Sequence, residues 1–347
     1  MEDFCIVPES RRYWVIRSER GVYLEHFLEH GFVAIGHLDD LNLKPTDRRP
    51  FETNWPTVRE RLLARFESLG LKRRSAFAVV SQAKSFVDDI KEDDWVLVPG
   101  TSRIAVGRIV SPAFLDNETS YSRDEHGTEL EMSFNLRRDV VWGPSLWRRE
   151  LSSPLRRSLV ANQTVFNVDE HWEAIYHALF PVFQRGEKLY FTAKLTSEAP
   201  VSNLDITAFL SLLSDIEVLS KGLQEGIDAT NFDEYFRKYR ERNELTLTTK
   251  AEFYSPGDIW VELLTQTIPA IKEFGWMPFA AMAYNMLFGN KKKGMDGVVD
   301  LKTRQRIWAI LLDRIESRGA GIAMKNMGVD TPTKKVASLS APQSGDE

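Results

Sequence analysis

The first half of the chain is built from short apolar runs, many of them rich in aromatic and β-branched side chains. Runs of this kind, bounded by turn residues, are typical of β-strands. They predict strands at residues 12–17, 32–37, 94–99, 104–110, 135–142 and 165–168. Apolar residues at helical spacing predict helices at residues 22–30, 54–69, 81–90 and 170–180. Short strands interspersed with helices predict an α+β fold with a small curved β-barrel and flanking helices.

The second half has longer helical segments. Its elements are predicted strands at residues 188–196 and 245–254 and predicted helices at residues 205–224, 232–241 and 297–318. Ser255, Pro256 and Gly257 form a stop and turn, and an apolar stretch that we expect to be helical extends from there to Gly289. This order predicts a second, helix-rich α+β domain.

Charge and length indicate where the domains divide. Almost all cations before Gly186 are arginines, whereas lysine is common after it. A chain of 347 residues is longer than one typical domain. We therefore predict a first domain over residues 1–186, a second over residues 187–327, and a disordered tail over residues 328–347, where apolar periodicity is lacking.

Composition excludes several classes of protein. Hydrophobic residues make up 43% of the chain, which supports folded cores and excludes global disorder. The net charge of −5 excludes a wholly basic coat protein for nucleic acid, while a local basic surface stays compatible with it. A single cysteine, Cys5, excludes an internal disulfide and a cysteine-based zinc site.

The sequence favours a cytoplasmic setting. Its first residues lack the apolar core of a signal peptide. No uncharged apolar run reaches the roughly 20 residues that a membrane helix needs. Residues 274–290 come nearest, but they contain Gly275 and Pro278, so a buried helix or helical hairpin is favoured over a membrane segment.

Standard catalytic signatures, such as phosphate-binding loops and nucleophile elbows, do not occur in the sequence. Asp296, Asp300 and Lys302 form a nuclease-like string, because Mg²⁺-dependent nucleases use two carboxylates and a lysine. Those carboxylates usually come from adjacent strands, whereas Asp300 stands in the first turn of a predicted helix, where the helix dipole favours an acid. We therefore predict no catalytic residue, cofactor or metal, and keep this string as a weaker alternative.

Aromatic and arginine side chains of the first half point to nucleic acid. An exposed base can stack on aromatic faces while arginines hold its backbone, and a flipped base is read in a similar pocket. For any single residue, a place in the core or a solvated surface remains the commoner environment.

Six segments in the first half carry a family resemblance through their order and spacing. They are RYWVIR at residues 12–17, VYLEHFLEHGFVAIGHLDDL at 22–41, SQAKSFVDDIKEDDWVLVP at 81–99, SRIAVGRIVSPAF at 102–114, LRRDVVW at 136–142 and the closing segment at 152–168, which ends in TVFNV. Together the region from Arg12 to about Leu179 resembles the EVE-like branch of the PUA-like superfamily. Such domains occur at the N-terminus of modification-dependent restriction proteins of the Mrr and McrBC kinds. The sequence departs from the family pattern at His37, where an aromatic is frequent, and at Asp93, where glycine is usual.

The resemblance implies a modified base held in an aromatic-lined pocket. The positions that match the pocket are Trp14, His37, Ser81, Phe86 and Trp95, and the matching phosphate contacts are Arg17 and Arg103. In proteins of this arrangement the second domain is usually an effector or oligomerisation unit. A homo-oligomer or a protein partner bound through residues 187–327 is therefore expected.

Three functions are compatible with these observations. The favoured one is a nucleic-acid-binding sensor of a modified base, with DNA as the expected partner, in prokaryotic defence against foreign DNA. An alternative is a Mg²⁺-dependent restriction-type endonuclease with the same reader, acting through Asp296, Asp300 and Lys302. A second alternative is a sensor of a nucleotide or protein, associated with a membrane through residues 274–290.

Overall fold

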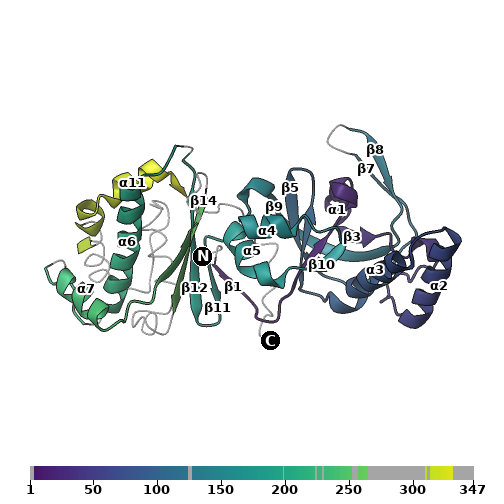
Figure 1. The fold of residues 1–347 in the computed structure, drawn as a ribbon, viewed down its shortest axis with the longest axis horizontal. Helices are drawn as coiled ribbons and strands as arrows, with labels where there is room; N and C mark the ends of the chain where they lie inside the picture. Colours follow the sequence, from purple (N-terminus) through teal and green to yellow (C-terminus); the bar gives the residue numbers. More distant parts are fainter. Residues whose placement is uncertain are drawn as a thin grey trace, which may run out of the picture. The chain divides into compact units, whose positions relative to one another are not determined.

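The computed structural model describes residues 4–123, 127–197, 199–222, 225–228, 230–251, 257–264, 309–310 and 313–330. The chain forms two compact units (Figure 1). Ser10–Leu179 makes up one, which we call the curved-sheet unit. The described residues of Met1–Glu9 and Phe180–Thr333 make up the other, which we call the second unit. The mixed α+β class predicted from the sequence is confirmed.

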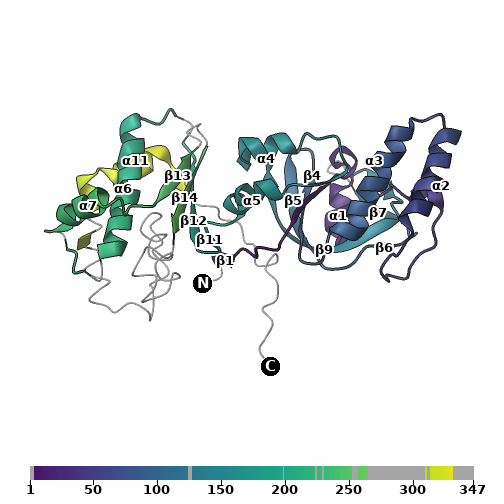
Figure 2. The ribbon, with the colours of Figure 1, turned by 60° about the horizontal axis from the view of Figure 1, so that its bottom comes forward.

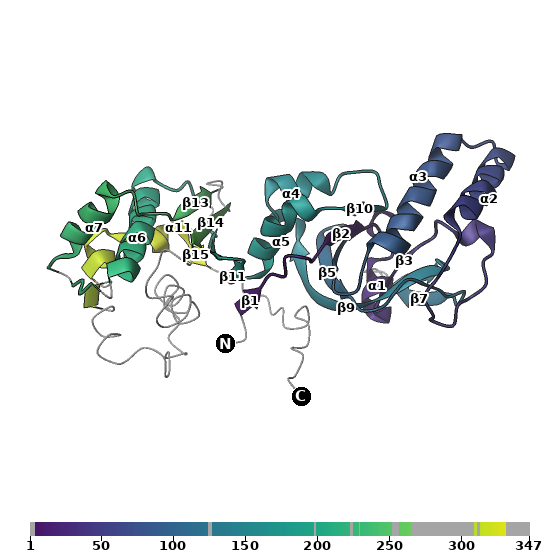
Figure 3. The ribbon, with the colours of Figure 1, turned by 90° about the horizontal axis from the view of Figure 1, so that it is seen from below.

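The sheet of the curved-sheet unit curls into a half-barrel (Figure 3). Its strands follow the order β10 (Val165–Asn167), β2 (Tyr13–Ile16), β4 (Trp95–Pro99), β5 (Arg103–Ile109), β9 (Leu136–Trp147) and β3 (Phe32–Ile35). β2 and β4 run parallel, and the other neighbours on this path are antiparallel. A short strand, β6 (Phe114–Leu115), also pairs with β9.

The long strand β9 carries the sheet around its bend. Its first residues pair with β3 and β6, and the residues from Val140 onward pair with β5. The register of β5 and β9 shifts between Ala105 and Gly107. A Cβ atom at Gly107 would stand 2.3 Å from the side chain of Val140, so only glycine permits this close crossing.

Helices flank the curved sheet. They are α1 (Leu24–His30), α2 (Trp55–Ser68), α3 (Arg73–Lys84), which continues into a π-helical turn at Ser85–Asp89, α4 (Ser153–Ser158) and α5 (Trp172–Leu179). α1 ends at Gly31 in the left-handed conformation, as its sequence predicts. α2 begins with the Asn54 side chain accepting a hydrogen bond from the Thr57 N–H at 3.1 Å. α2 and α3 lie side by side (Figure 2). A hairpin of β7 (Ser120–Arg123) and β8 (Glu129–Met132) completes the unit.

The second unit is a sheet with helices on one face (Figure 1). The strand order is β1 (Phe4–Ile6), β11 (Val182–Arg185), β12 (Lys188–Leu195), β14 (Gly257–Leu264) and β13 (Thr248–Ala251), and β15 (Val329–Asp330) also pairs with β12. Its helices are α6 (Asn203–Gly222), α7 (Phe232–Glu241) and α11 (Ala320–Met327). On α6, the fully buried Asp215 accepts hydrogen bonds from Arg314 at 3.2 Å and Arg318 at 3.1 Å.

Three boundaries differ from those predicted. The units divide after Leu179 rather than at residue 186, because β11 pairs with both β12 and β1. The stretch that follows Gly257 begins as strand β14 and not as a helix, because it pairs with β12 and β13. The predicted tail from residue 328 starts too early, because Val329–Asp330 pairs with β12.

Other predictions lie outside the described residues. They concern the string Asp296, Asp300 and Lys302, the stretch of residues 274–290, most of the predicted helix at residues 297–318, and residues 331–347. Within the part of the chain that the structure describes, no helix is both long and apolar enough to cross a membrane.

Candidate nucleic-acid interface

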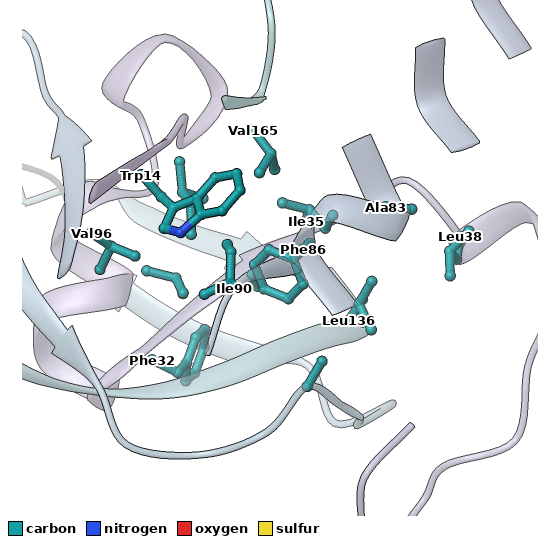
Figure 4. Close-up of a cluster of buried hydrophobic side chains, with 14 of the residues drawn as sticks. Trp14, Phe32, Ile35, Leu38, Ala83, Phe86, Ile90, Val96, Leu136 and Val165 are labelled. Carbon is teal, nitrogen blue, oxygen red and sulfur yellow. The ribbon is translucent and has the colours of Figure 1, made fainter. Parts of the chain in front are cut away.

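The structure separates the three aromatic residues that were predicted to line one pocket. Trp14 and Phe86 lie inside the half-barrel, in a cluster with Ile35, Val96 and other apolar side chains (Figure 4). Trp95 pairs with Tyr13 on the neighbouring strand, and Trp14 pairs with Val96. Because side chains alternate along a strand, Trp95 faces the opposite side of the sheet from Trp14. There its ring stacks on Tyr176 of α5, with 4.8 Å between the ring centroids.

All three rings are core residues, which corrects their predicted role as a stacking surface. Trp14 is 3% exposed, Phe86 0% and Trp95 1%. The Trp14 indole donates a hydrogen bond to Asp94 at 3.0 Å, and Asp94 also accepts from the backbone of Arg12 and Lys91. Burial raises the pKa of Asp94, and these hydrogen bonds oppose part of the shift. None of the three rings presents an open face to a base in this conformation.

The other two predicted base contacts, His37 and Ser81, come from the turn after β3 and from α3. The His37 side chain lies close to that of Gln82 on α3. Gln82 Oε1 also accepts hydrogen bonds from the backbone N–H groups of Thr164 and Val165, the latter at 3.1 Å. Ser81 is the exposed neighbour of Gln82 on α3. Gln82 thus joins the turn of His37 to the start of β10.

Burial shapes the chemistry of His37. It lowers the pKa of the imidazole, and the nearby Gln82 side chain opposes part of the shift. His37 is therefore neutral at pH 7, where its ring offers one donor and one acceptor. Such a ring, beside the Gln82 amide, suits recognition of a polar edge.

Arg17 joins this group through the segment that precedes β10. Its backbone N–H donates to the Thr164 carbonyl at 2.9 Å, and its guanidinium donates to the Leu159 carbonyl. Arg103 differs, because its guanidinium pairs with Glu25 at 2.5 Å and its charge is compensated. Gln82 and Arg17 therefore contact the same segment, residues 159–165, with His37 beside Gln82, and Arg103 lies outside this group.

An uncompensated cationic surface adjoins these residues. Residues 70–87 contain four cations and no aspartate or glutamate. The cations are exposed, and none forms an ion pair among the residues that the structure describes: Lys72, Arg73, Arg74 and Lys84. Phe77 lies on the same face of α3 as Arg73 and Ser81, because the three are four residues apart, and it is 44% exposed. We call Arg73, Phe77, Ser81 and Lys84 the α3 stripe.

Sequence reasoning missed Gln82, Thr164 and the α3 stripe as a unit. The absence of acidic residues from residues 70–87 is the sequence signal that could have identified the stripe. The contacts of Gln82 with β10 join residues more than 80 positions apart, which no local pattern indicates.

The site offers cations and neutral hydrogen-bonding groups rather than metal ligands. Across the described ranges, no three His, Cys, Asp or Glu side chains come together in a way that would hold a metal ion. Such an arrangement is equipped to bind an anionic polymer and to read a polar edge.

Comparisons with protein-family models, with curated proteins and with solved structures found no match to this chain. The EVE-like resemblance therefore rests on the sequence segments alone.

Proposed function

We propose that the chain is a nucleic-acid-binding protein whose curved-sheet unit senses a modified base in DNA. One observation carries the proposal: Gln82, which lies beside His37, and Arg17 contact the same segment, residues 159–165, and the helix that carries Gln82 also carries the cationic α3 stripe. This combination matches the division of labour in nucleic-acid recognition, in which cations position the backbone and neutral polar groups read the base.

Each part of the site has a role in this proposal. Arg73 and Lys84 of the α3 stripe, the neighbouring Arg74 and Arg17 hold backbone phosphates. Phe77 of the stripe offers an exposed ring for stacking. His37 and Ser81 hydrogen-bond to the edge of the base. The buried rings of Trp14 and Phe86 pack in the core of the half-barrel, and Trp95 packs on the opposite face of the sheet. All three therefore stabilise the fold that carries the site and do not contact the base.

The wider function follows from the EVE-like resemblance. It supports a role in prokaryotic defence against foreign DNA, with the second unit as an oligomerisation or partner-binding element. A restriction-type endonuclease that uses Asp296, Asp300, Lys302 and Mg²⁺ remains the alternative, and a membrane-associated sensor acting through residues 274–290 the second. No observation on the described residues favours either one.

Binding of the full chain to labelled duplexes tests the proposal. The duplexes carry either unmodified bases, modified cytosine or modified adenine, and fluorescence anisotropy is measured at about 50 and 200 mM salt. The variants are the double variant Arg73→Ala/Arg74→Ala and the single variant His37→Ala. A matched control, Arg237→Ala/Arg240→Ala, removes two exposed arginines from α7 of the second unit.

We expect the Arg73→Ala/Arg74→Ala variant to weaken binding to every duplex and to reduce the salt slope by about 0.9 for each lost phosphate contact. We expect His37→Ala to remove the preference for the modified duplex and to leave binding to the unmodified duplex nearly unchanged. Absence of binding to any duplex at low salt would refute the proposal. An equal loss of duplex binding in the α7 control variant would refute the assignment of binding to the cationic surface of α3.

A further inference from the structure

Two arginines reach the same end of the curved sheet from different strands. Arg17 directly follows β2, and Arg148 directly follows β9. Between them, the register places Gly100 of the β4–β5 turn opposite Arg103, which in turn pairs with Trp147. The turn that follows Arg17 also approaches Gly100 closely. A Cβ atom added at Gly21 of this turn would lie 2.9 Å from the Cα atom of Gly100.

Both guanidinium groups are held by main-chain carbonyls rather than by acids. Arg17 donates to the Leu159 carbonyl, and Arg148 donates to the Gly100 carbonyl at 2.8 Å. Over the described ranges, neither side chain has a carboxylate within 4.0 Å. The Nε atoms of both residues are buried and have no hydrogen-bond partner among the described residues. Neither charge is therefore balanced by a carboxylate among the described residues, and both side chains keep part of their donor capacity.

Each arginine has a buried serine hydroxyl near it in the sequence. Ser18 follows Arg17 and is 0% exposed, and Ser152, four residues after Arg148, is 5% exposed. Neither hydroxyl has a hydrogen-bond partner within the part of the chain described here. Buried polar atoms are nearly always satisfied, because leaving one without a partner costs about 1–3 kcal/mol. Four such atoms lie in these two segments, and a bound anion could serve as a partner for them.

Electrostatics agree with this geometry. The pKa of Arg17 is lowered first by burial and then by the charge of Arg148, so the two cations repel one another. An anion placed between them would replace that repulsion with two attractions.

We propose that Arg17 and Arg148 form a phosphate-binding site at this end of the sheet, completed by the hydroxyls of Ser18 and Ser152. A phosphate group suits it because guanidinium groups pair with phosphate oxygens through two parallel hydrogen bonds, and further oxygens remain for the hydroxyls. The phosphate comes either from a nucleic-acid backbone or from a free phosphate compound. The site stands on its own contacts, and only its use for nucleic acid rests on the proposed function.

Inorganic phosphate is the first probe. The melting temperature of the full chain is measured over a phosphate titration, with chloride at equal ionic strength as the reference. The variants are Arg17→Gln and Arg148→Gln. The control is Arg149→Gln, which removes the same charge from the next residue, whose guanidinium lies 5.8 Å from the centre of the Trp147 ring. Phosphorus NMR line broadening on the unaltered chain provides a measurement that requires no variant.

We expect a saturable rise in melting temperature of a few degrees with phosphate, as binding to the folded state predicts. Arg148→Gln and Arg17→Gln should reduce that rise by at least half, and Arg149→Gln should leave it intact. The proposal fails if the unaltered chain shows neither saturable stabilisation nor line broadening. It also fails if both variants keep the full response.

The duplexes of the previous section distinguish the source of the phosphate. If it is a nucleic-acid backbone, Arg148→Gln should weaken all duplexes about tenfold and reduce the salt slope by about 0.9. Phosphate binding without duplex binding supports the site and refutes the proposed function. Duplex binding that is unchanged in Arg148→Gln, in a chain that does not bind phosphate, refutes the site and leaves the function standing.

Discussion

Arg138 should be one of the residues on which the curved-sheet unit depends most. It is 2% exposed and donates hydrogen bonds to four main-chain carbonyls, those of Phe86, Val87, Ile90 and Ser111, at 2.7–2.9 Å. Three of these carbonyls close the π-helical turn that ends α3, where helices leave carbonyls without partners. Arg138 therefore ties the end of α3 to β9.

Two opposing effects set the cost of Arg138→Met. Four carbonyls, whose hydrogen bonds are buried or partly buried, lose a charged donor, at about 1.5–2 kcal/mol each. Against this, burial lowers the pKa of Arg138 to about 10, so removing the charge relieves about 3 kcal/mol of desolvation. The lost hydrogen bonds outweigh the relief, and we expect a net destabilisation of about 3–5 kcal/mol. Arg138→Lys keeps the charge but not the planar fork, so its cost should be intermediate.

The assay is urea unfolding of the full chain, combined with hydrogen exchange of the peptide that covers residues 85–90. Arg59→Met is the control, because Arg59 is an exposed arginine of α2. Arg138→Met should lower the stability of the curved-sheet unit and remove exchange protection from residues 85–90, while peptides of α6 keep theirs. If Arg138→Met unfolds within about 0.5 kcal/mol of the control, the four carbonyls do not depend on this side chain and the reasoning is refuted.

Three further changes test other parts of the structure. Burial raises the pKa of Asp39 from 3.8 to about 6. The unfolded chain therefore ionises this carboxyl more readily than the folded chain, and the free energy of unfolding falls as pH rises from 4 to 6. Asp39→Asn should raise the free energy of unfolding by about 2 kcal/mol at pH 7 and leave it unchanged at pH 4. Asp215→Asn leaves Arg314 without its buried partner and should cost the second unit about 3–5 kcal/mol in urea unfolding. Trp95→Ala leaves a cavity beside Tyr176 and should cost the curved-sheet unit about 3–5 kcal/mol.

Each of these has a result that contradicts it. A pH profile of Asp39→Asn that parallels the unaltered chain would show that this carboxyl is not the group that titrates. Loss of the curved-sheet transition in Asp215→Asn would show that the two units do not unfold independently. If the Trp95→Ala chain keeps its stability but binds DNA less well, Trp95 contributes to recognition and not to the core.

Elements whose signals are local could be predicted from the sequence. α1 and its end at Gly31 are examples, because a left-handed glycine directly follows an apolar helical pattern. Strand β14 shows the opposite case. Residues 257–264 form a short apolar run that suits a helix or a strand equally, and pairing with β12, more than 60 residues away, decides the outcome.

The site could be predicted only in part for the same reason. His37, Ser81 and Arg17 were identified by their positions in matching segments. The structure links His37 and Arg17 through Gln82 and Thr164, and Ser81 is the exposed neighbour of Gln82. Trp14 and Trp95 were assigned to one pocket because both are aromatic residues on strands. Their opposite faces follow from the parallel register of β2 and β4, in which Tyr13 and not Trp14 is the partner of Trp95. The register between two distant strands cannot be predicted from the sequence of either strand alone.

The pairing of β1 with β11 has a consequence for how the chain is made. The curved-sheet unit is an insertion between these two strands, which meet at Phe4 and Val182. At ordinary translation rates, β1 emerges on the order of ten seconds or more before its partner exists. For that interval it is an unpaired strand edge, open to pairing with another nascent chain. The inserted unit can complete its own fold in the meantime, so β1 is synthesised before the curved-sheet unit but belongs to a sheet that closes after it.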